Sequence, residues 1–299
     1  MSVPSDWSCA LSPTPRMVMW QAPEDLAPFV SGYQLYVVGD IGEPNRGAFE
    51  PAWASVRVAV IGGHDWRVRR ASESWSTPPQ VSLFGPSSEL VWSESGPGVL
   101  VGAGIRPRGW LRLFGEPART WADRIGIPPF PQTRVSEQLR ELFRTLELDE
   151  DVPRAFDAVF REALRLPTAD DAAIAAIEAA LVDPVIASVR ELTEVTGLPL
   201  RRVQRLADRA FGFSPKLLLR RARFLRSLHA MRSAARGEGA TTIDPGYTDY
   251  SHFVRDSHDF LGMSPQAFLD RDMPLLKRSL DLRTRVLGTP AQALDPVPD

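Results

Sequence analysis

The sequence predicts an α+β protein with a β-rich N-terminal domain, a helical linker and an all-α C-terminal domain that contains two helix-turn-helix units. Three observations lead to this prediction. All eight tryptophans of the 299-residue chain lie within residues 1–121. From about Thr133 onward, the apolar residues follow helical spacing. The pattern Gly-x-Ser-Pro occurs twice in the C-terminal half, beginning at Gly212 and at Gly262.

The predicted N-terminal domain, residues 1–130, contains short β-type runs that glycine and proline interrupt at intervals of about ten residues. This spacing is typical of an antiparallel sandwich or barrel. The segment Arg108–Phe114, after Pro107, is predicted to form a short helix that closes the domain. The runs are Tyr33–Val38, Val56–Ile61, Trp66–Arg70, Gln80–Phe84, Glu89–Ser93 and Val99–Ile105.

Residues 131–182 are predicted to form the helical linker. Apolar residues recur at helical spacing over 139–146 (Leu139, Leu142, Phe143, Leu146) and again over 156–164. Thr168 is the expected N-cap of a third helix, with Asp170 and its neighbour favouring the positive end of the helix dipole. The apolar stripes supply dimer contacts, relay a signal, or simply pack as a spacer.

Two copies of one pattern organise residues 183–272. In each copy a glycine favours a left-handed helix end, and Ser-Pro is typical of an N-cap followed by proline at the first helical position. Further upstream, Gly197 and Gly246 lie where one helix turns into the next. We therefore expect two helix-turn-helix units joined by a long helix. The copies read Arg205-x6-Gly212-Phe213-Ser214-Pro215 and Arg255-x6-Gly262-Met263-Ser264-Pro265.

These motifs resemble the DNA-binding region of the AraC/XylS family of bacterial transcription regulators. The family pattern runs from a short helix through a glycine turn into a recognition helix, then through Gly-x-Ser-Pro into a long connecting helix, and repeats. Here Gly197-Leu198 and Gly246-Tyr247 occupy the two turns, and Arg223 stands where the family has an arginine in the connecting helix. The resemblance implies a cytoplasmic regulator that binds double-stranded DNA, with RNA polymerase and a second copy of the chain as further candidate partners.

The resemblance places the base-facing positions of the first recognition helix at Arg201, Gln204 and Arg205. These residues share one helix face, and arginine can read guanine while glutamine reads adenine. Alternatively, Arg201 and Arg202 contact only phosphate, which fixes register and not sequence. His252 in the second unit either faces DNA or packs between helices. The predicted DNA contacts are Arg201, Arg202, Gln204, Arg205, Arg209, Arg221, Tyr250, Ser251, His252 and Arg255.

Charge separates the two units. Residues 183–236 hold 12 basic and 4 acidic residues, net +8, whereas residues 237–272 hold 2 basic and 7 acidic residues, net −5. Because phosphate binding requires cations, we expect the first unit and the connecting helix to supply most of the affinity. The second unit has drifted from DNA binding or contacts a protein such as RNA polymerase. The connecting-helix cations are Lys216, Arg220, Arg221, Arg223 and Arg226.

Two departures from the family pattern support an alternative function. A phenylalanine usually follows the recognition-helix arginine at two residues, and here those positions are Ala207 and Ser257. Phe211 and Phe213 can refill the first of these spaces. Together with the acidic second unit, the lost aromatics favour a degenerate family member that acts as a protein-interaction module and binds DNA weakly or not at all.

The segment Gly102-x-Gly104-Ile105-Arg106-Pro107 with Trp110 resembles an uncharacterised β-rich domain that often precedes this DNA-binding module. The resemblance implies that the domain senses a small molecule or another protein. Its tryptophans line an apolar pocket or form the core. Residues 273–299 are expected to be a frayed tail, with no clear period after Leu287.

Composition argues against several other classes. Cys9 is the one cysteine, which excludes an internal disulfide framework and a cysteine-built zinc site. His64 is the one histidine of the first half, so we expect no metal and no cofactor. We find no nucleophile elbow, phosphate loop or paired-acid motif, and predict no enzyme. No apolar run reaches the ~18 residues of a membrane span, and no signal peptide is evident.

Overall fold

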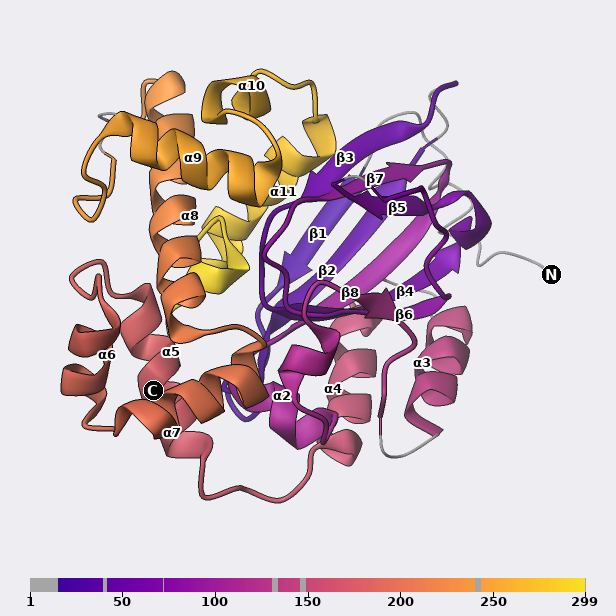
Figure 1. Cartoon of the computed structure of the whole chain (residues 1–299). Coiled ribbons are helices and arrows are strands. Elements are labelled where there is room, and N and C mark those ends of the chain that lie inside the picture. The colour runs from indigo at the N-terminus through magenta and orange to yellow at the C-terminus, as the bar shows by residue number, and fades with distance from the viewer. Residues whose placement is uncertain are drawn as a thin grey trace.

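The computed structural model agrees with the predicted fold class: the described strands lie between Arg16 and Gly126, and the elements from Arg134 onward are helical (Figure 1). Cys9 and Leu146 lie outside the described residues, as do the side chains of Leu142 and Phe143. The structure describes residues 16–39, 42–71, 73–130, 134–145, 149–239 and 243–298.

The N-terminal strands form two antiparallel sheets. The larger has the order β1-β2-β8-β4-β6-β9, and the smaller β3-β7-β5. All six predicted runs coincide with strands; β1, β3 and β9 were missed. The bounds are β1 Arg16–Trp20, β2 Val30–Val38, β3 Asn45–Phe49, β4 Ala54–Ile61, β5 Arg67–Arg70, β6 Val81–Phe84, β7 Val91–Ser95, β8 Gly98–Ile105 and β9 Ile125–Gly126.

Strand β4 presents different chemistry on the two faces of the larger sheet. Val56 and Val58 are fully buried in the main core, to which α3 (Arg134–Thr145) and α4 (Asp151–Ala163) also contribute. The alternate residues Ser55, Arg57 and Ala59 line a cavity. Because successive side chains of a strand point to opposite faces, this division follows from the period of two. The cavity is described below.

The apolar stripe of the second linker helix is buried within the chain, as is Leu139 of the first. On α4, Phe156 and Phe160 are fully buried, and the ring of Phe156 stacks on Tyr33 of β2 with centroids 5.4 Å apart. The packed-spacer interpretation therefore describes this stripe, and its side chains are not free to contact a second copy. The third linker helix, α5 (Asp171–Val182), begins with Asp170 at the N-cap position, so the predicted cap at Thr168 is wrong. The Thr168 hydroxyl instead bonds to the carboxylate of Asp171.

The C-terminal helices end and begin where the glycines and Ser-Pro pairs predict. Gly197, Gly212 and Gly262 have φ values of 65°, 83° and 75°, the left-handed region that glycine adopts readily. Ser214 and Ser264 cap the helices that follow them. The elements are α6 Val189–Thr196, α7 Leu200–Leu206, the π-helical turn η4 Ala207–Phe211, α8 Pro215–Ala235, α9 Tyr250–Leu261 and α10 Pro265–Leu269.

The second unit is less complete than the first. Its recognition helix α9 starts after Asp249, whose carboxylate accepts the backbone N–H of His252 at 2.8 Å. Among the described residues of 236–249, none lies in a helix. Pro245 precedes the turn, and proline both lacks an N–H and restricts the residue before it. The helix that should lead into the second turn is therefore missing from the described part of this segment.

The predicted frayed tail is wrong. Residues 273–299 contain the helix α11 (Pro274–Leu287) and the short turn η5 (Gln292–Leu294), which lie between the C-terminal helices and the sheets (Figure 1). The Gln292 amide donates to Ser31 Oγ and to the Ala54 carbonyl, each at 3.1 Å. Leucines of α11 pack into the core of the whole chain, which orders the segment. No described helix is both long and apolar enough to cross a membrane.

Candidate nucleic-acid interface

The first unit is held in shape by local capping and a small core. Ser188 Oγ accepts the Glu191 N–H at 3.2 Å, while the Glu191 carboxylate accepts the Ser188 N–H at 3.0 Å, forming a capping box at the start of α6. Backbone N–H donors, that of Ala187 foremost, lower the pKa of Glu191. Leu192 of α6 and Val203 of α7 are fully buried. These contacts fix the angle between the two helices of the unit.

The recognition helix α7 presents the predicted base-facing residues to solvent. Arg201, Gln204 and Arg205 are exposed, while Val203 and Leu206 are buried on the opposite side. The three polar side chains therefore occupy the face that a major groove would meet. Their contacts with bases stay predictions.

Three arginines of α7 and of the turn η4 that follows it surround one carboxylate, which the sequence pattern had assigned only to a helix dipole. Guanidinium nitrogens of Arg202, Arg205 and Arg209 each lie 3.4 Å from a carboxylate oxygen of Asp170, at the start of α5. Asp170 is mostly buried, whereas the arginines are 41–49% exposed. Only the fold brings the linker against α7, so no local signal in the sequence could have identified this cluster.

The end of the recognition helix packs on the N-terminal domain. Arg119 donates to Asp208 at 3.0 Å. Phe211 is fully buried, and its ring meets the edge of Trp53 with centroids 5.4 Å apart. A side chain at Gly212 would come within 3.2 Å of the Ala118 carbonyl oxygen. The turn η4, which continues the helix that should read DNA, is therefore covered by the β-rich domain.

Arg221 of α8 does not lie on the surface, which corrects the prediction of a DNA contact. It is 1% exposed, and its Nη1 donates to the Ala52 carbonyl at 3.0 Å and the Ser87 carbonyl at 2.8 Å. The guanidinium lies 4.2 Å from the ring centroid of Trp53. Burial lowers its pKa to about 9. Arg221 joins the two domains and is unavailable to phosphate.

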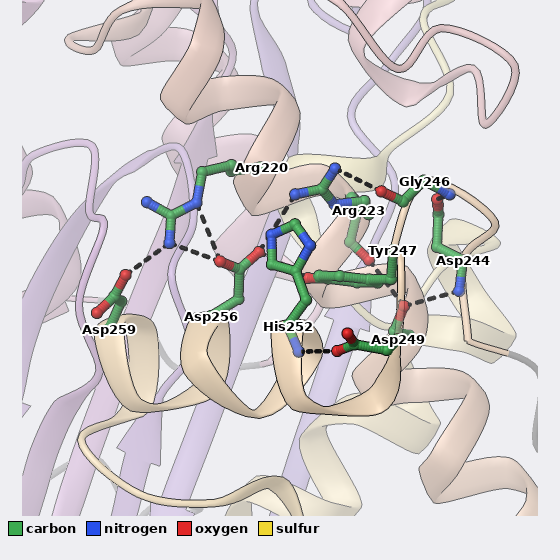
Figure 2. Close-up of polar contacts among 10 residues, drawn as sticks. Arg220, Arg223, Asp244, Gly246, Tyr247, Asp249, His252, Asp256 and Asp259 are labelled. Carbon is green, nitrogen blue, oxygen red and sulfur yellow. Dashed lines mark hydrogen bonds and ion pairs between the residues drawn. The ribbon is translucent and has the colours of Figure 1, made fainter.

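Other connecting-helix arginines bind the acidic residues of the second unit (Figure 2). Arg220 Nη2 lies 2.6 Å from Asp256 Oδ1 and 2.6 Å from Asp259 Oδ2. Arg223 Nη1 donates to the Gly246 carbonyl at 3.0 Å. Arg226 Nε donates to Asp244 at 2.8 Å. The expectation that these three cations grip DNA is therefore corrected: they hold α9 and its preceding turn against α8. Lys216, in the first turn of α8, is exposed.

Asp256 is the centre of that cluster. It is 2% exposed, and its Oδ2 accepts the Tyr247 hydroxyl at 2.8 Å. Arg223 Nη2 lies 3.5 Å from the same oxygen, and the Arg223 guanidinium lies 4.4 Å from the Tyr247 ring centroid. Figure 2 shows the carboxylate between the arginines and the tyrosine. Burial, together with the neighbouring carboxylate, raises the pKa of Tyr247. A buried carboxylate with several donors is well satisfied, so this joint is rigid.

The second recognition helix has an exposed face of mixed character. Tyr250 is 49% exposed, and Ser251 and Arg255 are also exposed. His252 is half-buried, and its ring lies edge-on to Tyr247 with centroids 5.1 Å apart. Of the two roles expected for it, packing within the protein therefore describes this side chain in part. Ser257, where the family has an aromatic, is fully buried and donates to the Met263 carbonyl at 2.7 Å.

Comparison with known families identifies the C-terminal region. Residues 192–271 match the family described as a helix-turn-helix domain, and this region is a helix-turn-helix domain of the AraC type. The match lies inside the predicted segment 183–272. No curated protein sequence shows significant similarity to the chain.

Solved structures of ToxT from Vibrio cholerae are similar to the chain over most of its length. One, at 1.65 Å resolution, is 11% identical, covers 86% of this chain and 97% of that chain, and has a TM-score of 0.43. Another, of wild-type ToxT with bound unsaturated fatty acid, is 12% identical, covers 86% and 94%, and has a TM-score of 0.42. Because these values are low, the proposals for this chain rest on its own residues and on the family match.

Proposed function

We propose that this chain, whose C-terminal region is an AraC-type helix-turn-helix domain, is a sequence-specific DNA-binding transcription regulator. The observation that carries the proposal is the exposed polar face of α7, formed by Arg201, Gln204 and Arg205 within the matched region. Arginine and glutamine on one helix face can donate to guanine and adenine edges in the major groove. The first unit reads the sequence.

The second unit makes a smaller contribution. Two units joined by one helix can set their recognition helices in successive major grooves, ~34 Å apart. On α9, Arg255 is the exposed cation, and Tyr250 and Ser251 can add hydrogen bonds. The exposed Asp259 of the same helix opposes phosphate, because like charges repel. The same acidic surface suits a protein partner, and RNA polymerase is the candidate.

Control by the N-terminal domain follows from the two restraints on the recognition helix. DNA phosphates and the Asp170 carboxylate compete for Arg202, Arg205 and Arg209. The docking of Phe211 on Trp53 restricts the approach of the same helix to a duplex. A small-molecule signal at the β-rich domain that loosens this docking would raise DNA affinity. A homodimer remains a candidate state, through surfaces other than the buried α4 stripe.

The test is selection of DNA fragments from the source genome by the purified full-length protein. Wild type is expected to enrich fragments that share one sequence motif. The triple variant Arg201→Ala, Gln204→Ala, Arg205→Ala is expected to lose the motif. Arg190→Ala, which removes an exposed arginine of the preceding helix α6, is the matched control and should retain it. Wild type that enriches no motif would refute sequence-specific binding.

One observation favours the alternative of a protein-interaction module with weak or no DNA binding. Of the cations that the connecting helix offers, Arg220, Arg221, Arg223 and Arg226 are all bound to other parts of the chain. The affinity available from phosphate contacts is reduced accordingly. The same selection experiment separates the two functions, because a protein-interaction module would retain no DNA above background at physiological salt.

A further inference from the structure

A cavity of about 170 Å³ lies between the two sheets and the C-terminal segment. Strands β2, β3, β4 and β8 form its floor and one side. Leu275, Leu276, Leu280 and Leu287 of α11 line another side. Its walls are mostly apolar, and cavities of this kind take small organic molecules. Nothing in the DNA-binding proposal uses this space.

One cation on the cavity wall has no anionic partner among the described residues. Arg57 of β4 is 7% exposed, and the strand residues on either side of it, from Val56 to Ile61, are apolar. Its Nε donates to Ser55 Oγ at 3.1 Å, and its Nη1 has no hydrogen-bond partner in the described part of the chain. The rings of Phe49 and Phe84 cover the guanidinium, with centroids 3.7 Å and 4.5 Å away. Burial lowers the pKa of Arg57 to about 10.

The other charged groups on the cavity wall each have a neighbour that can carry the opposite charge. The Glu50 carboxylate lies 2.9 Å from His229 Nε2 of α8, and Arg283 of α11 is bound to Asp295. Arg221, a second buried arginine, has two backbone carbonyls as acceptors. Arg57 differs from Arg221 because its one acceptor within the described residues is the Ser55 hydroxyl, whereas Arg221 has two backbone carbonyls. Burying a cation in this way is costly unless an anion accompanies it.

A second unsatisfied donor lines the same cavity. Asn45 of β3 is buried, and its Nδ2 has no hydrogen-bond partner within the described residues. Glu50 Oε2, on the same wall, also lacks a hydrogen bond within the described residues, but it has His229 Nε2 2.9 Å away. Arg57 Nη1 and Asn45 Nδ2 both donate hydrogen bonds, so a molecule that satisfies these two atoms must supply acceptors. A carboxylate does so with two oxygens and one negative charge, and it fits the fork of a guanidinium.

Glycines of β8 keep the floor of the cavity open to polar side chains. A Cβ at Gly102, which pairs with Arg57 across the sheet, would lie 2.7 Å from Gln34 Nε2. A Cβ at Gly104 would lie 2.1 Å from Ser31 Oγ and 2.6 Å from Gln292 Nε2. The Gly-x-Gly pattern is therefore explained by the polar side chains beside the cavity, which leave no room for a Cβ at either glycine.

We propose that the cavity binds a small organic carboxylate, with the carboxylate on the Arg57 guanidinium and an apolar body against the leucines of α11. A cavity of about 150 Å³ holds benzene, so the body is about the size of one six-membered ring. The inference rests on the proposed function, since it names the chemical class of the signal that the N-terminal domain receives. Because one wall belongs to α11, such a ligand touches both the sheets and the segment after the second unit.

The test uses matched pairs of probes on the full-length protein without DNA. Cyclohexanecarboxylate and phenylacetate are each compared with their neutral amides by isothermal titration calorimetry. Wild type is expected to bind each acid about 10- to 100-fold more tightly than its amide, as a charge-assisted pair should allow. Arg57→Met keeps an unbranched side chain beside the two phenylalanines but removes the guanidinium, and is expected to bind acid and amide equally.

Two controls keep the outcome decisive. Arg46→Met removes an exposed arginine of β3 that does not line the cavity, and should behave as wild type. Arg57→Lys retains the cation and should retain the preference for the acid. If Arg57→Met does not fold, the neutral variant Arg57→Gln replaces it in the comparison and is likewise expected to bind acid and amide equally. Equal affinity of wild type for acid and amide, no binding of either acid, or a preference that survives Arg57→Met would overturn the proposal.

The outcome is independent of DNA binding. A failure of both acids to bind leaves the selection of genomic fragments untouched, because no DNA enters the titration. Loss of the DNA motif in the recognition-helix variants leaves the titration untouched in the same way. The unliganded Arg57→Met protein should also melt at or above the temperature of wild type, because it no longer buries an unpaired cation.

Discussion

The two helix-turn-helix units differ in what their charged residues contact. In the first unit, arginines of the recognition helix face one carboxylate of the linker, Asp170, and stay largely exposed. In the second unit, Asp256 is buried beneath arginines of α8 and fixes the unit to the connecting helix. Part of the +8 charge of residues 183–236 is thus offset within the molecule by the −5 charge of residues 237–272. The comparison teaches that pairing inside the fold, and not net charge, decides which cations can meet DNA.

The largest expected effect tests the joint of the second unit. Asp256→Asn keeps the shape of the side chain but removes the charge that faces Arg220, Arg223 and Tyr247. Breaking a buried ion pair leaves an uncompensated charge, so unfolding of the full chain in urea should reveal a loss of about 3–5 kcal/mol. Asp259→Asn is the control, because Asp259 is 63% exposed and its pair should be worth about 1 kcal/mol or less. If the two variants unfold at the same urea concentration, the buried pair of Asp256 contributes no more to stability than the exposed pair of Asp259.

A smaller effect tests the restraint on the first unit. Asp170→Asn removes the carboxylate that competes with phosphate, while asparagine still suits the N-cap of α5. Exposed ion pairs are each worth about 0.2–1 kcal/mol, so affinity for the selected DNA should rise about fivefold. Glu194→Gln, which removes one exposed negative charge of α6, is the matched control. If both variants gain affinity to the same extent, the gain comes from the lower negative charge of the protein as a whole. Asp170 then does not restrain the arginines of the first unit.

The smallest effect concerns the connecting helix. Lys216 is exposed in the first turn of α8, whereas Arg220 is bound to Asp256 and Asp259. Lys216→Ala should reduce the slope of log affinity against log salt by about 1, since one phosphate contact is lost. Arg220→Gln should leave this slope unchanged where the protein is folded. A reduced slope for Arg220→Gln would mean that this arginine leaves its carboxylates to contact phosphate.

Local chemistry predicted the helix ends and most strands. Gly197, Gly212 and Gly262 end helices because the left-handed conformation costs glycine little, and this property needs no knowledge of the fold. The missed strand β3, Asn45–Phe49, contains asparagine and glycine, which disfavour strands, and it forms because β7 pairs with it. Pairing partners far away in the chain supply what local propensity does not.

Side-chain roles that depend on distant segments could not be predicted. Arg221 looked like a surface cation because its acceptors, the Ala52 and Ser87 carbonyls, lie more than a hundred residues earlier in the chain. The C-terminal leucines looked like a tail because the sheets they cover are distant in sequence. The role of Arg57 could have been suspected from the sequence. An arginine within the apolar run Val56–Ile61 is unusual for a buried strand and indicates a functional position.

The most direct measurement of the central claim compares two single variants on the selected DNA at one salt concentration. Arg205→Ala removes an exposed arginine from the face of α7, and is expected to cost ~1–3 kcal/mol while relaxing specificity at one position. Arg255→Ala removes the corresponding arginine of α9, and is expected to cost less and leave specificity unchanged. Equal losses for the two variants would show that both units read DNA alike, and would contradict the inequality of the two units.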